Sequence, residues 1–288
     1  MLTAEGGQWA QWLEHVSHDF YHTEAYHLFS ERNGEGLAHL MVYGAKERFV
    51  AWPFLLRRID GDKGLPGNNL MDVAAVYGYT GPLIKGCGPG DPFLDAAWAA
   101  FCRIWRKSQV VSVFTCFHPL LENHRWCTRF RGELGSASGD PEPLHYCGQS
   151  ISIDLTLPTE ENWRNYSRVL RQEIQGARRR GLVFEIDHDW RRLKDFLQLY
   201  HGTMERNRAS PRYFFSADYL RQLRSTLRGH LYLSLVRLGE QVAAAMLVVE
   251  YRGVVQAHLA GTDPAFRAVS PLKLLFDEVR LWARKRNS

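Results

Sequence analysis

Three strand-like runs followed by a helical run, close to the end of the chain, constrain the fold more than any other feature of the sequence. The strand-like runs cover residues 230–236, 241–250 and 254–260, and the pairs Leu238-Gly239 and Arg252-Gly253 lie between them. Short apolar strands joined by glycine-containing turns are typical of an antiparallel meander. We therefore expect three neighbouring strands in one sheet, the third leading into a helix over residues 271–286.

The connection between the third strand and this helix is a candidate binding site. Ser270 precedes Pro271, a pair typical of the cap and the first position of a helix. A helix start presents unpaired backbone N–H groups, so an anion or a carbonyl oxygen could bind there, and Arg267 and Lys273 add positive charge beside it. An ordinary strand-to-helix connection explains the same pattern, because a fold does not imply a function.

The rest of the sequence shows a similar order of elements twice. In the first half, hydrophobic periodicity predicts helices over residues 8–15, 23–30 and 92–107, strands over 37–43 and 48–59, and a buried strand over 110–114. In the second half it predicts strands over 150–155 and 182–186, a helix that starts at 158–161, and helices over 166–180, 189–207 and 216–227. Residues 132–148, rich in Gly, Ser and Pro, are the best linker candidate. The simplest interpretation is two copies of one α/β unit, with domains 1–148 and 149–288.

Positive charge is concentrated in one predicted helix. The chain has a formal net charge of +5, and residues 163–181 hold six arginines but a single acidic residue, Glu173. Arg168 and Arg171 share a helical face, and Arg178 lies about two turns further along. Because arginine binds phosphate through two parallel hydrogen bonds, this face suits a nucleic acid, a nucleotide cofactor or a nucleotide-linked sugar. A solvated helix face is the alternative interpretation.

Composition argues against several classes of protein. The longest apolar run has about ten residues where about twenty are needed to cross a bilayer, so no membrane span is expected. The first eleven residues lack the basic and apolar regions of a secretory signal. The five cysteines include no C-x-x-C pair, which argues against a metal site or a disulfide framework and favours a reducing compartment. We therefore expect a cytoplasmic protein without a metal.

Three motifs carry a resemblance to a known family. They are Asp72-Val-Ala-Ala-Val-Tyr-Gly-Tyr-Thr-Gly-Pro-Leu83, the run from Arg168 to Ile174 leading to Ala177-Arg-Arg-Arg-Gly181, and Thr203-Met-Glu-Arg206 with Tyr213-Phe214. Together with the order of elements, they resemble the FemAB-like branch of the GCN5-related N-acetyltransferase (GNAT) superfamily over about residues 21–286. The resemblance implies an α/β (α+β) fold of two tandem GNAT-like domains, each a mixed, mostly antiparallel sheet flanked by helices.

The resemblance also implies a function. The branch includes enzymes that add amino acids from aminoacyl-tRNA to peptidoglycan precursors, and acyltransferase-like proteins of exopolysaccharide and envelope clusters. It implies an acyltransferase that moves an acyl or aminoacyl group from acyl-CoA or aminoacyl-tRNA, bound as a co-substrate, to an amine of a small molecule or envelope precursor. The N-terminal domain would hold the acceptor and the C-terminal domain the donor, with tRNA as a possible partner, no DNA and no tightly bound cofactor. The alternative is a non-catalytic RNA-binding or scaffold protein with a degenerate transferase fold.

Individual residues acquire expected roles from the same resemblance. Backbone N–H groups from Ala260 to Thr262 could polarise the acyl carbonyl. Asp263, Glu205 or His258 could act as a general base, and the Tyr213 phenol could protonate the departing group. The expected donor-binding residues are Ala260, Gly261, Arg267, Ser270, Lys273, Arg168, Arg171 and Arg178, and the expected acceptor-binding residues are Tyr77, Tyr79 and Thr80. Structural roles are the alternatives: Glu205 could pair with Arg206, His258 could belong to the core of its strand, and Tyr213 could simply pack.

Two features depart from the family pattern. Acetyltransferases that use coenzyme A usually have a glycine-rich pyrophosphate loop, but residues 267–271 contain no G-x-G, which argues against coenzyme A. Relatives usually continue past such a final helix into another strand with an Asp-(aliphatic)-Gly-Gly turn. The sequence ends at Ser288, so we expect the sheet to lack that strand.

Overall fold

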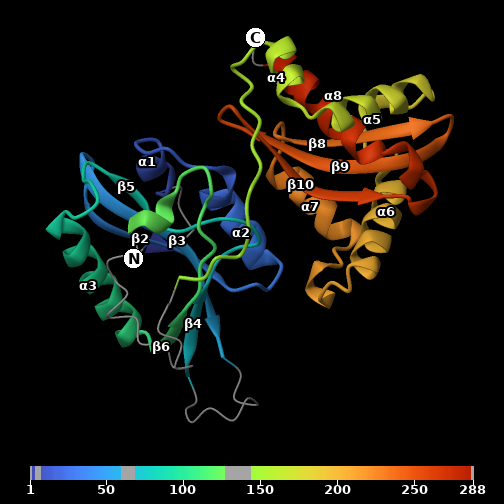
Figure 1. The fold of residues 1–288 in the computed structure, drawn as a ribbon. Coiled ribbons are helices and arrows are strands. Elements are labelled where there is room, and N and C mark those ends of the chain that lie inside the picture. The colour runs from blue at the N-terminus through green and yellow to red at the C-terminus, as the bar shows by residue number, and fades with distance from the viewer. Residues whose placement is uncertain (1, 4–7, 60–68, 127–143, 287–288) are drawn as a thin grey trace. The chain divides into compact units, whose positions relative to one another are not determined.

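The chain folds into two compact units, residues 1–150 and 151–288. The computed structural model describes residues 2–3, 8–59, 69–126 and 144–286, so residues 132–143 of the linker candidate lie outside the described residues. Each unit contains one β-sheet with helices packed on its faces (Figure 1). This arrangement confirms the expected mixed α/β class with two helix-flanked sheets.

The N-terminal unit is built on a six-stranded sheet. Its strands are β1 (Leu2–Thr3), β2 (Leu37–Ala45), β3 (Arg48–Arg58), β4 (Met71–Ala74), β5 (Leu83–Lys85) and β6 (Val110–Val113). The strand order is β1-β2-β3-β4-β6. Strand β5 pairs with the first part of β3, and β4 pairs with its last part. Only the β4–β6 pair is parallel among these described strands.

The helices of the N-terminal unit are α1 (Ala10–Leu13), α2 (Glu24–Arg32) and α3 (Pro92–Lys107), with a short 3-10 helix, η1 (Phe20–His22). Helix α3 begins where the sequence predicts, because Asp91 caps the N–H of Phe93 and Pro92 occupies the first turn. Its buried aromatic side chains, among them Trp98 and Trp105, pack against Trp52 of β3.

The C-terminal unit is built on a four-stranded antiparallel sheet. Its strands are β7 (Val183–Ile186), β8 (Leu231–Leu238), β9 (Gln241–Tyr251) and β10 (Val254–Thr262), in the order β10-β9-β8-β7. The turn between β9 and β10 consists of Arg252 and Gly253, both with positive φ (49° and 81°), as a two-residue hairpin requires. The predicted meander is therefore present.

Helices cover both faces of this second sheet. They are α4 (Thr159–Asn165), α5 (Arg168–Arg179), α6 (Leu193–Arg206), α7 (Ala217–Thr226) and α8 (Pro271–Arg286), with the 3-10 helices η4 (Pro211–Tyr213) and η5 (Pro264–Val269). Helices α6 and α7 lie on one face, and α8 and α5 lie on the other (Figure 1). Helix α8 has the bounds that the sequence predicts, and Gly181, with φ 83°, follows the end of α5 as the glycine signal predicts.

One predicted strand is absent, and another is less buried than predicted. Residues 150–155 are irregular, and Ile151 is 95% exposed; Asp154 and Leu155 instead bond through their carbonyl oxygens to Asn162 and Arg284. The strand predicted as buried over 110–114 exists as β6, but it lies at the edge of its sheet, where Val111 and Phe114 are exposed.

None of the helices in the described ranges combines the length and the apolar composition needed to cross a bilayer.

Candidate active site

The carboxyl end of β10 is fixed by side chains from α6. The N–H of Thr262, the last residue of β10, donates to Oγ1 of Thr203 at 3.2 Å. The carbonyl oxygen of Thr262 accepts from Nη2 of Arg206 at 2.8 Å, and the same nitrogen donates to Thr203 Oγ1. The motif Thr203-Met-Glu-Arg206 therefore meets the strand end that precedes the candidate binding loop.

Gly261 allows α6 to approach the strand this closely. A Cβ atom at Gly261 would lie 2.4 Å from the backbone carbon of Leu199 and 2.4 Å from the backbone nitrogen of Tyr200. Those atoms belong to the helix backbone and cannot rotate away, so any larger residue would displace α6. The position of Gly261 in the expected donor site thus has a packing reason.

The backbone N–H of Ala260 points away from the sheet at the edge formed by β10. Among the described strands, β10 is the outer strand of its sheet. The Asp263 N–H donates to the carbonyl oxygen of Ala243 at 3.0 Å. Because backbone N–H groups alternate in direction along an antiparallel strand, the N–H of Gly261 points toward β9, and those of Ala260 and Thr262 point away from it. Thr262 is engaged by Thr203, whereas the Ala260 N–H has no partner among the described residues. Of the three N–H groups expected to polarise a carbonyl, this one points away from β9 and is not engaged by Thr203.

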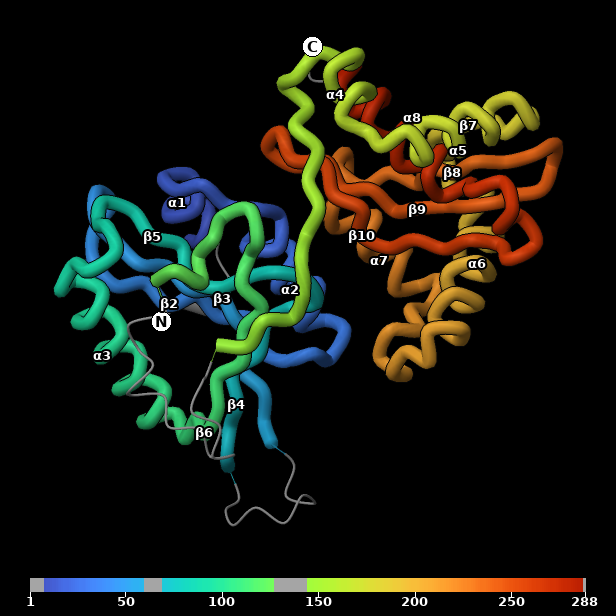
Figure 2. The backbone as a smooth tube through the Cα atoms, viewed as in Figure 1, coloured from blue at the N-terminus to red at the C-terminus, as the bar shows by residue number. Residues whose placement is uncertain are grey.

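The chain runs from β10 to α8 through a short connection (Figure 2). This connection contains the 3-10 helix η5 rather than a glycine-rich loop. The carboxylate of Asp263 caps η5 by accepting from the Ala265 N–H at 2.8 Å. Ser270 ends η5 in the left-handed region (φ 50°), and its carbonyl oxygen accepts from the N–H of Lys273. Since Pro271 has no N–H, few backbone donors remain at the start of α8.

Ser270 and Lys273 both bind one acidic residue of α5. Nζ of Lys273 lies 2.6 and 2.5 Å from the two carboxylate oxygens of Glu173, and the Ser270 hydroxyl donates to the same carboxylate at 3.1 Å. Hydrogen bonding by Lys273 lowers the pKa of Glu173. The positive charge expected from Lys273 is therefore balanced by the acidic residue of the arginine-rich helix.

Two of the three arginines expected to bind the donor are engaged in the fold. Arg171 donates to the carbonyl oxygens of Trp163 and Arg164, at the end of α4. Arg178 donates to Glu278 and Asp277 of α8 at 2.7 Å each. Burial opposes the charge of Arg178, but these bonds outweigh burial and raise the pKa of its guanidinium. Arg168 is exposed, as is Arg267 of η5, and neither makes an ion pair with a described residue.

Beneath Arg178 lies a buried polar cluster that the sequence does not reveal. Asp277 is 1% exposed and pairs with both Arg178 and Arg280. Burial, followed by the charge of Asp277, raises the pKa of the Tyr166 phenol, over whose ring the Arg280 guanidinium lies. Arg280 and Asp277 are three residues apart, a spacing that could have signalled the pair, whereas their link to Arg178 spans 99 residues.

The four candidate catalytic residues differ in accessibility. Glu205 is exposed at the end of α6, next to Arg206, whose guanidinium binds Thr203 and Thr262. Asp263 follows Thr262 and is half-buried. The Tyr213 phenol oxygen accepts from Arg212, and Tyr200 donates to its carbonyl, which ties η4 to α6. His258 is buried within β10 at the irregularity between Ala257 and Leu259.

The expected acceptor residues lie in the N-terminal unit around a buried dyad. Nε2 of His118 is 2.6 Å from Oδ2 of Asp19, and both side chains are almost fully buried. The ring of Tyr79, 39% exposed, lies edge-on to His118 at 6.0 Å. The sequence signal for this dyad was weak, because its members are 99 residues apart.

Other contacts hold the loop that carries these residues. The Tyr26 hydroxyl donates to the Tyr77 carbonyl, and Thr80 is buried with its hydroxyl 3.1 Å from that of Thr115. Gly78 has φ 128°, and a Cβ there would lie 2.0 Å from the ring of Tyr21. The loop is thus a fixed, aromatic surface, with Tyr79 as its exposed member.

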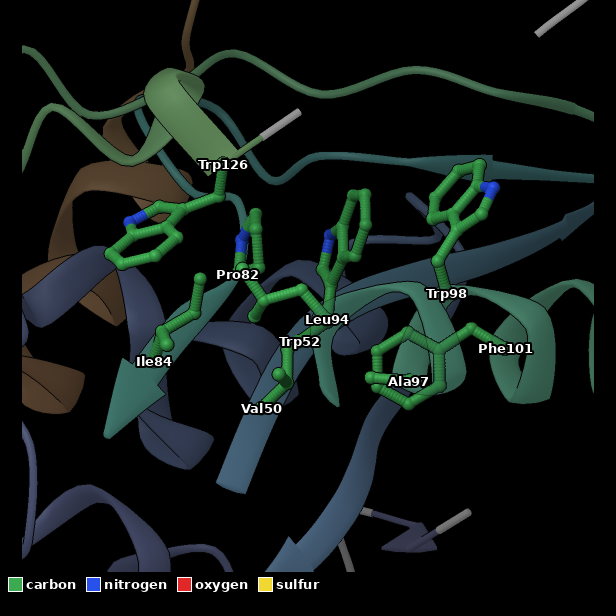
Figure 3. Close-up of a pocket in the computed structure, with 9 residues that line it drawn as sticks. All are labelled: Val50, Trp52, Pro82, Ile84, Leu94, Ala97, Trp98, Phe101 and Trp126. Atoms are coloured by element: carbon green, nitrogen blue, oxygen red, sulfur yellow. The ribbon is translucent and has the colours of Figure 1, made fainter. Parts of the chain in front are cut away.

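An apolar pocket in the same unit is too small for a substrate. It is lined by Trp52, Trp98 and Trp126 together with aliphatic side chains of β3, β5 and α3 (Figure 3). Its volume is about 20 Å³, little more than a single water needs. None of Tyr77, Tyr79 and Thr80 lines it, so it belongs to the core.

Comparison with known proteins identifies the class of fold. Residues 164–287 match the family model of the acetyltransferase (GNAT) domain. The crystal structure of FemX has a TM-score of 0.66 to this chain at 12% identity, covering 99% of this chain and 85% of FemX. The C-terminal DUF2156 domain of an Agrobacterium fabrum protein described as a lysylphosphatidylglycerol synthetase has a TM-score of 0.47 at 12% identity, covering 96% and 74% of the two chains. No curated protein sequence matches.

The GNAT family match and the likeness to FemX confirm the resemblance seen in the sequence. The residues after Arg164 form a GNAT domain, and the whole chain has a FemX-like fold. Residues 164–287 thus have the sequence pattern of a GNAT acetyltransferase domain, and the fold of the chain is similar to that of FemX.

Proposed function

We propose that this protein transfers an acyl or aminoacyl group from an activated donor to an amine, and that the reaction takes place at the carboxyl end of β10. The observation that carries the proposal is the Ala260 N–H, which points away from β9. It belongs to β10, the outer strand among those described in its sheet, whose end is fixed by Thr203 and Arg206.

The chemistry follows from this geometry. The acyl carbonyl oxygen accepts from the Ala260 N–H, which stabilises the negative charge that develops as the amine nitrogen attacks the carbonyl carbon. The bond between that carbon and the leaving oxygen or sulfur then breaks. Asp263 and Glu205 come from the two elements joined at Thr262, and either carboxylate could take the proton that the amine loses. The Tyr213 hydroxyl, whose oxygen accepts from Arg212, is the proposed proton donor to the leaving group.

The surroundings favour aminoacyl-tRNA as the first donor to test. A pyrophosphate is usually held by backbone N–H groups of a glycine-rich loop. At that position this chain has η5, Pro271, which lacks an N–H, and the Ser270 carbonyl, which accepts from Lys273. Exposed Arg267 and Arg168 remain as cations for phosphates of a nucleic acid donor. For the acceptor we propose the amine of a small molecule or envelope precursor.

The test is a transfer assay with full-length protein. Radiolabelled aminoacyl-tRNA and radiolabelled acetyl-CoA are each incubated with pooled amine acceptors, and labelled product is counted. We expect product from one of the two donors. We also expect one of the variants Asp263→Asn and Glu205→Gln, the one that removes the general base, to lower kcat by about a hundredfold. Glu160→Gln, an exposed carboxylate on α4, is the matched control. Absence of product from both donors, with folded protein, would overturn the proposal.

A further inference from the structure

A second hollow in the C-terminal unit lies at the opposite end of the sheet from Thr262. Its volume is about 500 Å³, within the range of small-molecule sites, and its wall includes the first residues of β8, Leu231 and Tyr232. Thr262 pairs with Ala244, which in turn pairs with Val236 near the other end of β8. The hollow is therefore separate from the candidate active site, and the inference below does not depend on the proposed function.

Three arginines face this hollow from one short stretch of chain. Arg221 and Arg224 are one turn apart on α7, and Arg228 follows in the connection to β8. Arg228 makes no ion pair with a described residue, and the pair of Arg221 with Asp218 is solvent-exposed on both sides. Exposed pairs of this kind contribute little, so a ligand can replace Asp218 at low cost.

Arg224 is fixed in place by neutral groups, so no described carboxylate balances its charge. Its Nη2 donates to the His188 carbonyl at 2.6 Å, and its guanidinium lies over the Trp190 ring at 5.1 Å. Both partners are neutral acceptors, and no carboxylate among the described residues pairs with Arg224. The carboxylate of Asp187, which also lines the hollow, accepts instead from the backbone N–H of Arg192 at 2.7 Å. The hollow thus keeps an excess of positive charge.

The loop that anchors Arg224 is held in an uncommon conformation. Trp190 is buried and has φ 61°, a region that bulky side chains rarely adopt. Such residues persist where surrounding contacts fix them and are concentrated at ligand sites. Here the conformation places the Trp190 ring under a guanidinium that lines the hollow.

We infer that this hollow binds a small phosphate ester of nucleotide size, with its phosphate held by Arg221, Arg224 and Arg228. Arginine suits phosphate because its planar fork forms two parallel hydrogen bonds and keeps its charge at every physiological pH. The volume accommodates a nucleoside monophosphate, and the three lining arginines come from one stretch of chain, α7 and the connection that follows it.

Calorimetric titration of the full-length protein with AMP, inorganic diphosphate and adenosine tests the inference. AMP and diphosphate are expected to bind at one site per chain, and adenosine is not. The double variant Arg221→Gln/Arg228→Gln changes two exposed side chains and leaves Arg224 in place. It is expected to raise the Kd for AMP by about tenfold or more. Arg103→Gln/Arg106→Gln on α3 removes two exposed arginines away from the hollow and is expected to leave binding unchanged.

Three results would overturn the inference. The first is equal AMP affinity in the two double variants, and the second is adenosine binding as tight as that of AMP. The third is a failure of AMP and diphosphate to bind while an RNA oligonucleotide binds with steep salt dependence, which would make the hollow part of a nucleic-acid surface.

Discussion

The backbone N–H of Thr262 donates to Oγ1 of Thr203, so the last residue of β10 is held by a side chain of α6. This bond fixes the strand edge at which the Ala260 N–H points away from β9. If the edge positions the acyl carbonyl, loss of the Thr203 hydroxyl should affect catalysis more than folding, because half-buried Thr203 contributes only one hydrogen bond to the strand.

For Thr203→Val we expect kcat to fall about tenfold, with a loss of about 1 kcal/mol in the free energy of unfolding. Steady-state transfer kinetics and urea unfolding measure the two effects. Thr203→Ser keeps the hydroxyl and should restore kcat. A Val variant with the kcat of the unchanged protein would show that the strand end does not position the substrate.

Gly261→Ala should destabilise the C-terminal unit by about 2–3 kcal/mol, because the added Cβ would lie 2.4 Å from backbone atoms of α6. Urea unfolding measures the change. The matched control is Gly202→Ala on the same helix, where the nearest atom is the flexible end of Arg206 at 3.4 Å. That variant should gain about 0.5 kcal/mol from its lower chain entropy. Similar stabilities for the two variants would contradict the close packing of α6 on β10.

Arg178→Met distinguishes a structural arginine from a donor-binding one. The substitution leaves Asp277 and Glu278 without this partner, so we expect a loss of about 1–2 kcal/mol, allowing for screening at the exposed side of Arg178. The KM for the donor should stay unchanged. The neighbouring exposed Arg179→Met should alter stability by less than about 0.5 kcal/mol. An increased KM with unchanged stability in Arg178→Met would instead restore the donor-binding role expected from the sequence.

Local signals in the sequence were sufficient for most elements. Helices α3 and α8 have the predicted bounds because each begins at a proline that follows a capping-type residue. The alternation of residues 150–155 was misleading, because alternation indicates a strand only where a neighbouring strand supplies hydrogen bonds. Here the carbonyl oxygens of that segment bind Asn162 and Arg284 instead.

The site was less predictable because its partners are distant in sequence. Six arginines near α5 indicate a basic face, but composition cannot show that Arg178 pairs with Glu278, which lies 100 residues away. The same holds for Lys273 and Glu173, and for the Asp19–His118 dyad. By contrast, the motifs around Thr203 and Thr262 were recognised separately, and only the fold shows that they meet.

His27 predicts a pH dependence of stability in the N-terminal unit. Burial lowers the pKa of His27 to about 4, and its Nδ1 lies 3.1 Å from the Thr23 carbonyl. The unfolded chain, with an ordinary histidine pKa of about 6.5, binds a proton that the folded state excludes, so stability falls as the pH drops from about 6.5 toward 4. His22, whose pKa burial lowers to about 3, acts in the same direction. His27→Gln should therefore reduce the loss between pH 6 and pH 5 by about 1 kcal/mol, measured by urea unfolding at each pH. The exposed His15→Gln should leave the slope unchanged, and an unchanged slope in His27→Gln would mean that His27 is not held neutral by burial.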